Sequence, residues 1–173
     1  LSTVILLGTY IGVAVTMIAV AGLDKVERFA DDPGLFGAVA DDVLGPNGLC
    51  FAPGESMLYV IESRGVPHRK ILAYDVTANG RELRHKRVVI DAGNGTPDGL
   101  RCDIDGNLWC GWGMGAEELD GVFIFAPDGT HIGRIALPER CANVCFGGRQ
   151  RNRLFMAASQ SLYALYVNTQ GAQ

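Results

Sequence analysis

The chain has 173 residues, of which 48 % are hydrophobic and 20 % are charged, a balance typical of a folded globular domain and unlike that of a disordered segment. Its formal net charge of −4, without a long basic run, argues against nucleic acid as a partner. The 23 glycines predict many tight turns between short strands.

Residues 1–23 form an uncharged apolar run. The run is long enough for a membrane helix of about 20 residues, and Gly8 and Gly12 have the spacing of small residues in packed membrane helices. Two alternatives stay open, namely two buried strands joined at one of these glycines and a stretch translated from outside the native frame. We treat residues 1–35 as an apolar leader, and residues 1–23 of this leader could contact a membrane. With a genuine leader the chain is membrane-anchored or periplasmic, and without one it is cytoplasmic.

Short apolar strands separated by turn residues follow the leader. We expect a strand at residues 36–43 and then four strands, at residues 47–51, 57–62, 71–76 and 82–90. Ala78-Asn79-Gly80 is typical of a hairpin turn, because Asn-Gly accepts positive φ at both central positions. The loop of residues 62–70 is either an ordinary solvated loop or a functional one. In the functional reading it presents three candidate substrate-binding side chains, those of Glu62, Arg64 and His68.

Two further groups of strands complete the chain. The first is expected at residues 98–104, 108–112, 121–126 and 131–136, and the second at residues 142–146, 153–157 and 162–166. Asp105-Gly106 and Asp128-Gly129 predict tight turns within the first group. The loop that follows residues 108–112 makes Trp112 a candidate to line a pocket.

The three groups repeat one pattern, in which a small polar residue precedes an apolar strand, a turn and a second apolar strand. Asn47, Asp98 and Asn143 hold equivalent positions in the three copies. Repeats of about 40–50 residues with several strands each predict a β-propeller. Six blades would need roughly 270 residues, so the chain has room for about three four-stranded blades, the last with three strands. The innermost strands of a propeller begin at its channel, and a ring of oxygen ligands there suits a hard divalent cation.

The motifs of this repeat, PNGL…LYV, AYDV, PDGL…DGNLW and CANVCFGG, resemble the SMP-30/gluconolactonase/LRE family in residues 41–167. Members of this family are six-bladed propellers that hydrolyse lactones and related esters with a divalent metal in the channel. The resemblance implies that Asp98 binds the metal and acts as base or nucleophile, and that Asn47 is a neutral oxygen ligand. It implies Ca or Zn, with Mg or Mn also possible, and a sugar lactone or similar cyclic ester as substrate.

The family site also uses a Glu from the first blade and an Asn from a blade ahead of the PNG motif, and neither has a match in this chain. We therefore expect residues 36–173 to be a partial, truncated propeller. The alternative function is a non-catalytic propeller fragment, a binding or assembly module whose missing blades self-association would supply. Asp98 alone could also be a turn residue, since Pro-Asp-Gly recurs around Asp128. Asn143 is a candidate wall residue of the substrate site.

The five cysteines are expected to be structural thiols. Three lie inside apolar strands, and Cys141 and Cys145 are too far apart along one strand for an easy disulfide. No pair of CxxC motifs indicates a zinc site, and the three histidines lack metal-ligand spacing. The Gly-x-Ser-x-Gly motif of a serine hydrolase does not occur.

Overall fold

The computed structural model describes residues 38–77, 82–114 and 116–172. The chain divides into two compact units, Leu1–Ala38 and Val39–Gln173, and the strands of the structure lie in the second. The expected leader and the hairpin turn at residues 78–80 lie outside the described residues. Within the described part, no helix is long and apolar enough to cross a membrane.

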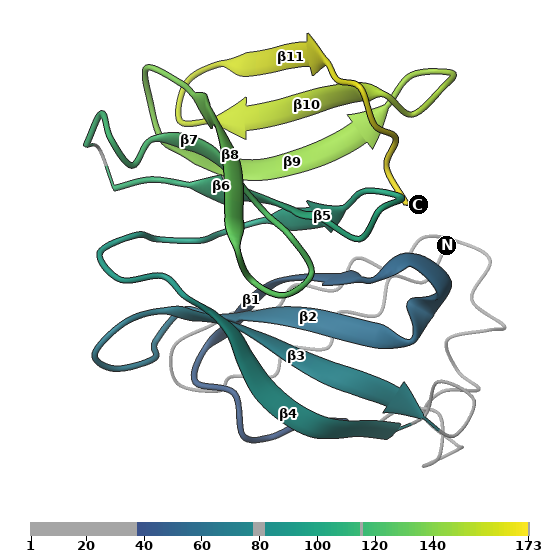
Figure 1. The fold of residues 1–173 in the computed structure, drawn as a ribbon. Coiled ribbons are helices and arrows are strands. Elements are labelled where there is room, and N and C mark those ends of the chain that lie inside the picture. Colours follow the sequence, from purple (N-terminus) through teal and green to yellow (C-terminus); the bar gives the residue numbers. More distant parts are fainter. Residues whose placement is uncertain (1–37, 78–81, 115, 173) are drawn as a thin grey trace, which may run out of the picture. The chain divides into compact units, whose positions relative to one another are not determined.

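The first sheet has four antiparallel strands in the order β1-β2-β3-β4, and they follow the predicted strands to within a residue or two. The strands are β1 (Pro46–Phe51), β2 (Met57–Glu62), β3 (Lys70–Thr77) and β4 (Glu82–Asp91), with a short 3-10 turn, η2 (Pro53–Glu55), between the first two (Figure 1).

The strand expected at residues 36–43 is not found over residues 38–43, and this prediction was wrong for that part. Ala40 and Val43 instead pack on the buried face of the first sheet. Asp42 accepts a hydrogen bond of 3.0 Å from the Tyr74 hydroxyl and forms an ion pair of 3.0 Å with Lys86. Side-chain contacts therefore hold this segment in place, whereas the sequence pattern predicted that backbone hydrogen bonds of a strand would do so.

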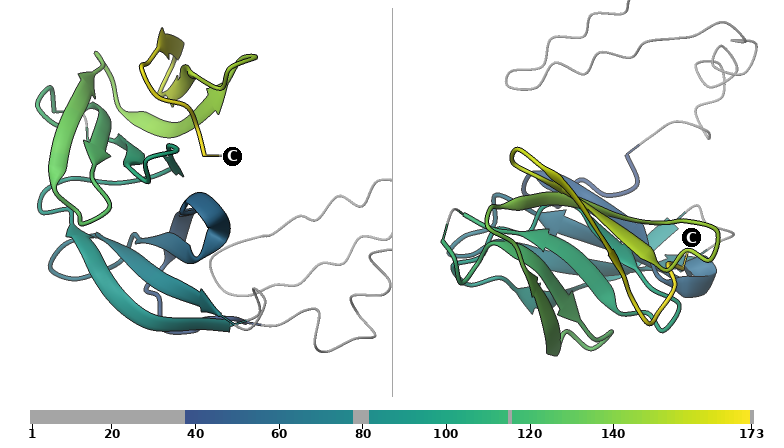
Figure 2. Two further views of the ribbon diagram at one scale, coloured as in Figure 1. Left: turned by 45° about the vertical axis from the view of Figure 1, so that its right-hand side comes forward. Right: turned by 90° about the horizontal axis from the view of Figure 1, so that it is seen from above.

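The second and third sheets repeat the arrangement with four and three strands. The second contains β5 (Leu100–Cys102), β6 (Leu108–Trp112), β7 (Gly121–Phe125) and β8 (His131–Ala136), and the third contains β9 (Cys141–Gly147), β10 (Arg153–Ala158) and β11 (Leu162–Tyr166). Figure 2 shows the sheets as successive layers. Three antiparallel sheets of this kind are the blades of a β-propeller, as the repeat predicted.

β5 is shorter than the strand expected at residues 98–104. At its start, the Gly99 amide donates to the carbonyl of Ala142 at 2.8 Å, so this bond crosses to the third sheet. At its end, the buried carboxylate of Asp103 bends the chain by accepting from the amides of Asp105 and Asn107, at 3.0 and 2.8 Å. Asp103 also accepts from the Trp109 indole at 3.0 Å.

The second blade packs on both neighbours because successive residues of a strand face opposite sides. Leu108, Cys110 and Trp112 lie in one core cluster with Tyr59 and Ile61 of the first blade. Their neighbour on the strand, Trp109, lies in a second cluster with residues of the third blade, including Val144, Phe146, Leu154 and Met156. Full burial of such a side chain is worth roughly 1.5–3 kcal/mol, so these interfaces hold the three blades together.

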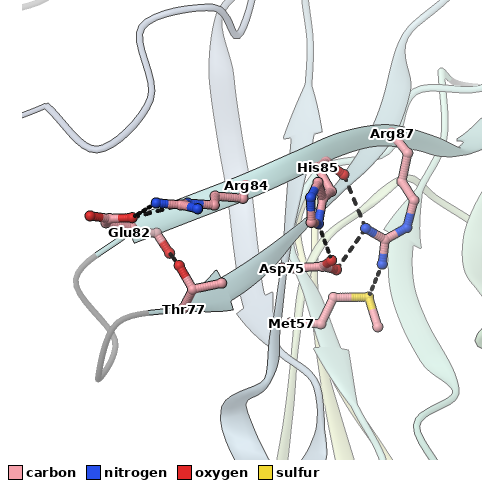
Figure 3. A network of polar contacts seen from close by, with 7 residues as sticks. All are labelled: Met57, Asp75, Thr77, Glu82, Arg84, His85 and Arg87. Atoms are coloured by element: carbon pink, nitrogen blue, oxygen red, sulfur yellow. Dashed lines mark hydrogen bonds and ion pairs between the residues drawn. The ribbon is translucent and has the colours of Figure 1, made fainter.

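A polar network joins β3 and β4 at the outer part of the first blade (Figure 3). Asp75 accepts hydrogen bonds of 2.8 Å from His85 and Arg87, and Arg87 also reaches the sulfur of Met57. The bond from His85, and then that from Arg87, lower the pKa of Asp75 below its ordinary value. His85 and Arg87 therefore stabilise the pairing of β3 with β4, away from the ends of the inner strands.

Candidate functional site

Close packing between glycines and neighbouring strands brings the inner strands of the three blades together. A Cβ added at Gly48 would lie 2.1 Å from the carbonyl oxygen of Asp98, and one at Gly99 would lie 2.2 Å from Oδ1 of Asn143. Neither position has room for a side chain, because such a Cβ would overlap a neighbouring strand. The residues at the three equivalent positions of the repeat therefore converge at one end of the inner strands.

Asn47 and Asp98 are in direct contact. The Asn47 Nδ2 donates a hydrogen bond of 3.1 Å to Oδ1 of Asp98. The other carboxylate oxygen, Oδ2, pairs with Nη2 of Arg140 at 2.7 Å. The Asp98 side chain is 22 % exposed, so a ligand from solvent can reach it.

The backbone fixes Asp98 in this position. Pro97 before it is among the most deeply buried residues, and the Asp98 amide donates to the carbonyl of Gly111 on β6 at 3.0 Å. A carboxylate held on a strand end by the core beneath it is preorganised for binding.

Sequence reasoning missed Arg140. Its backbone is anchored, since its carbonyl accepts from the Ser159 amide at 3.1 Å and its Cα lies 2.9 Å from an added Cβ on Gly113. The preceding Glu139 accepts from the Gln160 amide at 2.7 Å and from the Tyr163 hydroxyl at 3.0 Å. The sequence did contain one signal. Arg140 comes directly before the third inner strand, at the same end at which the acidic Asp98 precedes the second inner strand.

Asn143 lies beside Gly99 and is exposed. Its Oδ1 accepts from the Val144 amide at 2.9 Å, which is a local contact of its own strand. Its place at the wall of a substrate site stays a prediction.

The three candidates near residues 62–70 do not join Asp98 by a hydrogen bond or ion pair within the described part of the chain. Glu62 was expected near the channel mouth but is only 5 % exposed, and its Oε2 accepts from the Leu44 amide at 3.0 Å. The Arg64 stem packs on Gly45. His68 pairs with Asp91 at 2.8 Å. Glu62 is thus a buried anchor for the entry to β1, because it faces the segment that runs into that strand.

Trp112 is also a core residue and does not line an open pocket. It is 3 % exposed and stacks on Phe123 with ring centroids 4.9 Å apart. An added Cβ on Gly95 would lie 2.0 Å from its Nε1, so its outer edge is covered by backbone. The expectation failed because Trp112 continues the apolar face of β6.

The donor set matches a hard divalent cation in chemistry, because it combines a carboxylate and a side-chain amide at one point. The Arg140 guanidinium shows that the carboxylate already attracts a positive charge. Among the described residues, no group of three or more His, Cys, Asp or Glu side chains could hold a metal ion. Asn47 and Asp98 could offer two side-chain ligands to a cation, whereas Ca²⁺ usually takes six to eight.

Successive antiparallel blades with polar residues at their inner strand ends define the class of the molecule as a β-propeller. The pattern of the SMP-30/Gluconolactonase/LRE-like region matches residues 17–160, and the chain belongs to this family. The matched region begins inside the expected leader, at residues that lie outside the described part.

Relatives of known activity support the assignment. The chain is 35 % identical over 136 residues to the gluconolactonase of Zymomonas mobilis, a match that covers 73 % of this chain and 36 % of that enzyme. It is 26 % identical over 168 residues to the lactonohydrolase oryH of Aspergillus oryzae, covering 85 % of this chain and 34 % of the relative. The chain thus spans about a third of the length of these relatives.

Solved structures show the same blades. A gluconolactonase of Xanthomonas campestris superposes with a TM-score of 0.63 at 32 % identity, over 73 % of this chain and 39 % of that protein. A regucalcin of Agrobacterium tumefaciens, described as a calcium-binding protein, superposes with a TM-score of 0.64 at 22 % identity, over 77 % of this chain and 49 % of that chain. The second likeness concerns the fold alone.

Proposed function

We propose that Asn47 and Asp98 form part of a divalent-cation site, and that this site catalyses the hydrolysis of sugar lactones or related cyclic esters. The observation that carries this proposal is the contact of 3.1 Å between the two side chains at the ends of successive inner strands. Membership of a family with gluconolactonase and lactonohydrolase members favours this chemistry over other uses of a cation.

The chain's own residues have separate tasks in this proposal. Asp98 presents Oδ1, the oxygen that faces Asn47, while Arg140 holds Oδ2 at 2.7 Å and so orients the carboxylate. Asn47 turns its amide so that the carbonyl oxygen replaces the nitrogen that now faces Asp98, and it adds no charge. A bound cation would polarise the ester carbonyl and lower the pKa of water beside it. In this proposal Asp98 would also accept the proton of that water or attack the ester carbon directly.

The second candidate function is a non-catalytic module of the propeller. One observation favours it. The described residues offer two candidate ligands for a cation, and they contain no cluster of three or more Asp, Glu, His or Cys side chains that could hold one. Under the catalytic proposal the remaining ligands come from outside the described residues. We therefore expect weak turnover from this chain alone.

The test is hydrolysis of D-glucono-lactone with added Ca²⁺ or Zn²⁺, compared between the chain and its Asp98→Asn and Asp128→Asn variants. Asp98 and Asp128 share the Pro-Asp-Gly context. Asp128 lies exposed in the turn before β8, so its Asn variant is a matched control. We expect slow, metal-dependent hydrolysis that Asp98→Asn abolishes and Asp128→Asn retains. Metal-dependent hydrolysis by the Asp98→Asn variant at the wild-type rate would contradict the proposal.

A further inference from the structure

Two free thiols meet across the interface between the first and second blades. Cys50 on β1 and Cys102 on β5 have their sulfur atoms 3.7 Å apart, although the residues are 52 positions apart in the sequence. Their exposed fractions are 8 % and 4 %. The sequence predicted buried thiols without showing that these two would be neighbours.

The two strands are in close contact at their start, and β5 has a further anchor beyond the thiols. At the start of the strands, Gly48 lies against the carbonyl of Asp98 with no space for a Cβ. Beyond the thiols, the Ala172 amide donates to the Cys102 carbonyl at 3.0 Å. A disulfide needs a sulfur–sulfur distance of about 2.05 Å, so the two sulfurs would have to come roughly 1.7 Å closer.

A cavity of about 220 Å³ gives small molecules access to the pair. Both thiols line it, and so do the exposed side chains of Leu49 and Phe51, so the cavity is reached from the surface. Glu55 and Arg101 add one charge of each sign to its lining. A neutral reagent of a few atoms is the kind of molecule that this space admits.

We propose that Cys50 and Cys102 are a redox-modification site that closes to a reversible disulfide between the two blades. Cys50 lies three residues after Asn47, and Cys102 lies four residues after Asp98. The bond would tie together the two strands that carry the candidate cation ligands and fix their separation. The modification itself does not depend on the proposed catalytic function.

The oxidant in this step is a small organic disulfide, R–S–S–R. One of the two thiols gives its proton to water, attacks one sulfur of the reagent, forms a mixed disulfide and releases one thiolate, RS⁻. The second thiol then loses its proton to that thiolate and attacks the protein sulfur of the mixed disulfide, which displaces the second RS⁻, and this RS⁻ takes up a proton from water. Both RS⁻ groups leave as RSH, so two thiols and one reagent disulfide become one protein disulfide and two RSH.

The two thiols act as one pair, because their sulfur atoms are in hydrogen-bond contact. That hydrogen bond, followed by burial, raises the pKa of Cys50. The other buried thiols have different partners: Cys110 donates to the Gly111 carbonyl at 3.4 Å and Cys141 to the Asn143 carbonyl at 3.5 Å. Cys145 is exposed and serves as an internal reporter of reagent reactivity.

The experiment treats the folded chain with 2-hydroxyethyl disulfide and alkylates the remaining thiols after denaturation. Chymotrypsin then separates Cys102 from Cys110 by cutting after Leu108 or Trp109, and mass spectrometry identifies linked peptides. We expect a peptide pair joined through Cys50 and Cys102, a mixed disulfide at Cys145, and reversal by dithiothreitol. Cys145→Ser is the matched control and should retain the linked pair, whereas Cys102→Ser should lose it.

The proposal is overturned if Cys50 and Cys102 are recovered as separately alkylated thiols or as two mixed disulfides while Cys145 has reacted. It is also overturned if the linked pair forms only in the urea-unfolded chain. The wild-type peptide map decides by itself, so the result stands even where a Cys→Ser variant fails to fold.

Discussion

At the scale of single residues, Asp98 is defined by the different partners of its two oxygens. Asn47 meets Oδ1 and Arg140 meets Oδ2, so the carboxylate is shared between a neutral amide and a cation. A metal ion bound on the Oδ1 side of Asp98 would contact both proposed ligands. Arg140 competes electrostatically with any cation bound there, because both positive groups draw on one carboxylate.

Replacing Arg140 by Gln should therefore strengthen divalent-cation binding. An exposed ion pair contributes roughly 0.5–1 kcal/mol, which corresponds to a gain of about two- to fivefold in affinity. Isothermal titration with Ca²⁺ measures it, with Arg149→Gln on the exposed turn after β9 as the control. Unchanged or weaker binding in the Arg140 variant alone would show that Arg140 does not compete for Asp98.

Asp103 is a structural carboxylate, although it directly follows β5, the strand that begins beside Asp98. It is 1 % exposed and accepts from two amides, the Asn107 side chain and the Trp109 indole. Asp103→Asn would turn an amide N–H toward these donors and leave some of them buried without an acceptor. We expect a loss of about 2–4 kcal/mol in the free energy of unfolding, measured by urea denaturation. A loss no larger than that of the exposed control Asp128→Asn would argue against this role.

At the scale of elements, the repeat pattern was sufficient to predict nearly every strand, because alternating apolar residues between turn signals leave few other solutions. It failed at residues 38–43 and at the end of β5, where side chains take the place of the backbone ladder, and at the start of β5, where a backbone bond crosses to the third sheet. A position near a loop in the sequence also does not show which face of a strand is buried, as at Glu62 and Trp112. Arg140 was missed because its partner lies 42 residues away on another blade.

The outer edge of the first blade should be sensitive to acid through Asp75. Its pKa is lowered by His85 and Arg87, so its folded pKa lies below the unfolded value of about 3.9. The stabilisation from this network is therefore complete above the unfolded pKa and disappears as the pH falls through the folded pKa. The urea midpoint should decline between about pH 5 and pH 3 in the wild type.

The variant Asp75→Asn should be less stable at neutral pH and should lose part of that decline. Asp105→Asn, on the exposed turn after β5, is the matched control and should keep the wild-type profile. An Asp75→Asn profile parallel to the wild type across this range would show that the network does not couple to folding.

At the scale of the whole molecule, the two outer faces of the three-blade unit differ. The first blade is covered by the segment with Ala40 and Val43. On the third blade, Leu162 and Tyr166 of β11 are 72 % and 70 % exposed. Within the described residues, β11 pairs with β10 alone, so an apolar strand edge stays available for another chain.

We therefore expect the chain to self-associate through β11 as its concentration rises. Sedimentation velocity over a micromolar concentration series should show growing oligomers, and Leu162→Glu should shift the series toward monomer. Val66→Glu is the control, because Val66 is 80 % exposed in a loop outside β11. A monomer at all concentrations, or equal effects of the two variants, would contradict association through this edge.

Calorimetric titration of the chain with Ca²⁺ tests most directly whether Asn47 and Asp98 together bind a divalent cation. With two protein ligands we predict weak binding, with a dissociation constant of roughly 10⁻⁴–10⁻³ M, that is lost in Asp98→Asn and retained in Asp128→Asn. If Asp98→Asn bound Ca²⁺ as well as the wild type, the cation would sit elsewhere, and the site at the ends of the inner strands would not be a metal site.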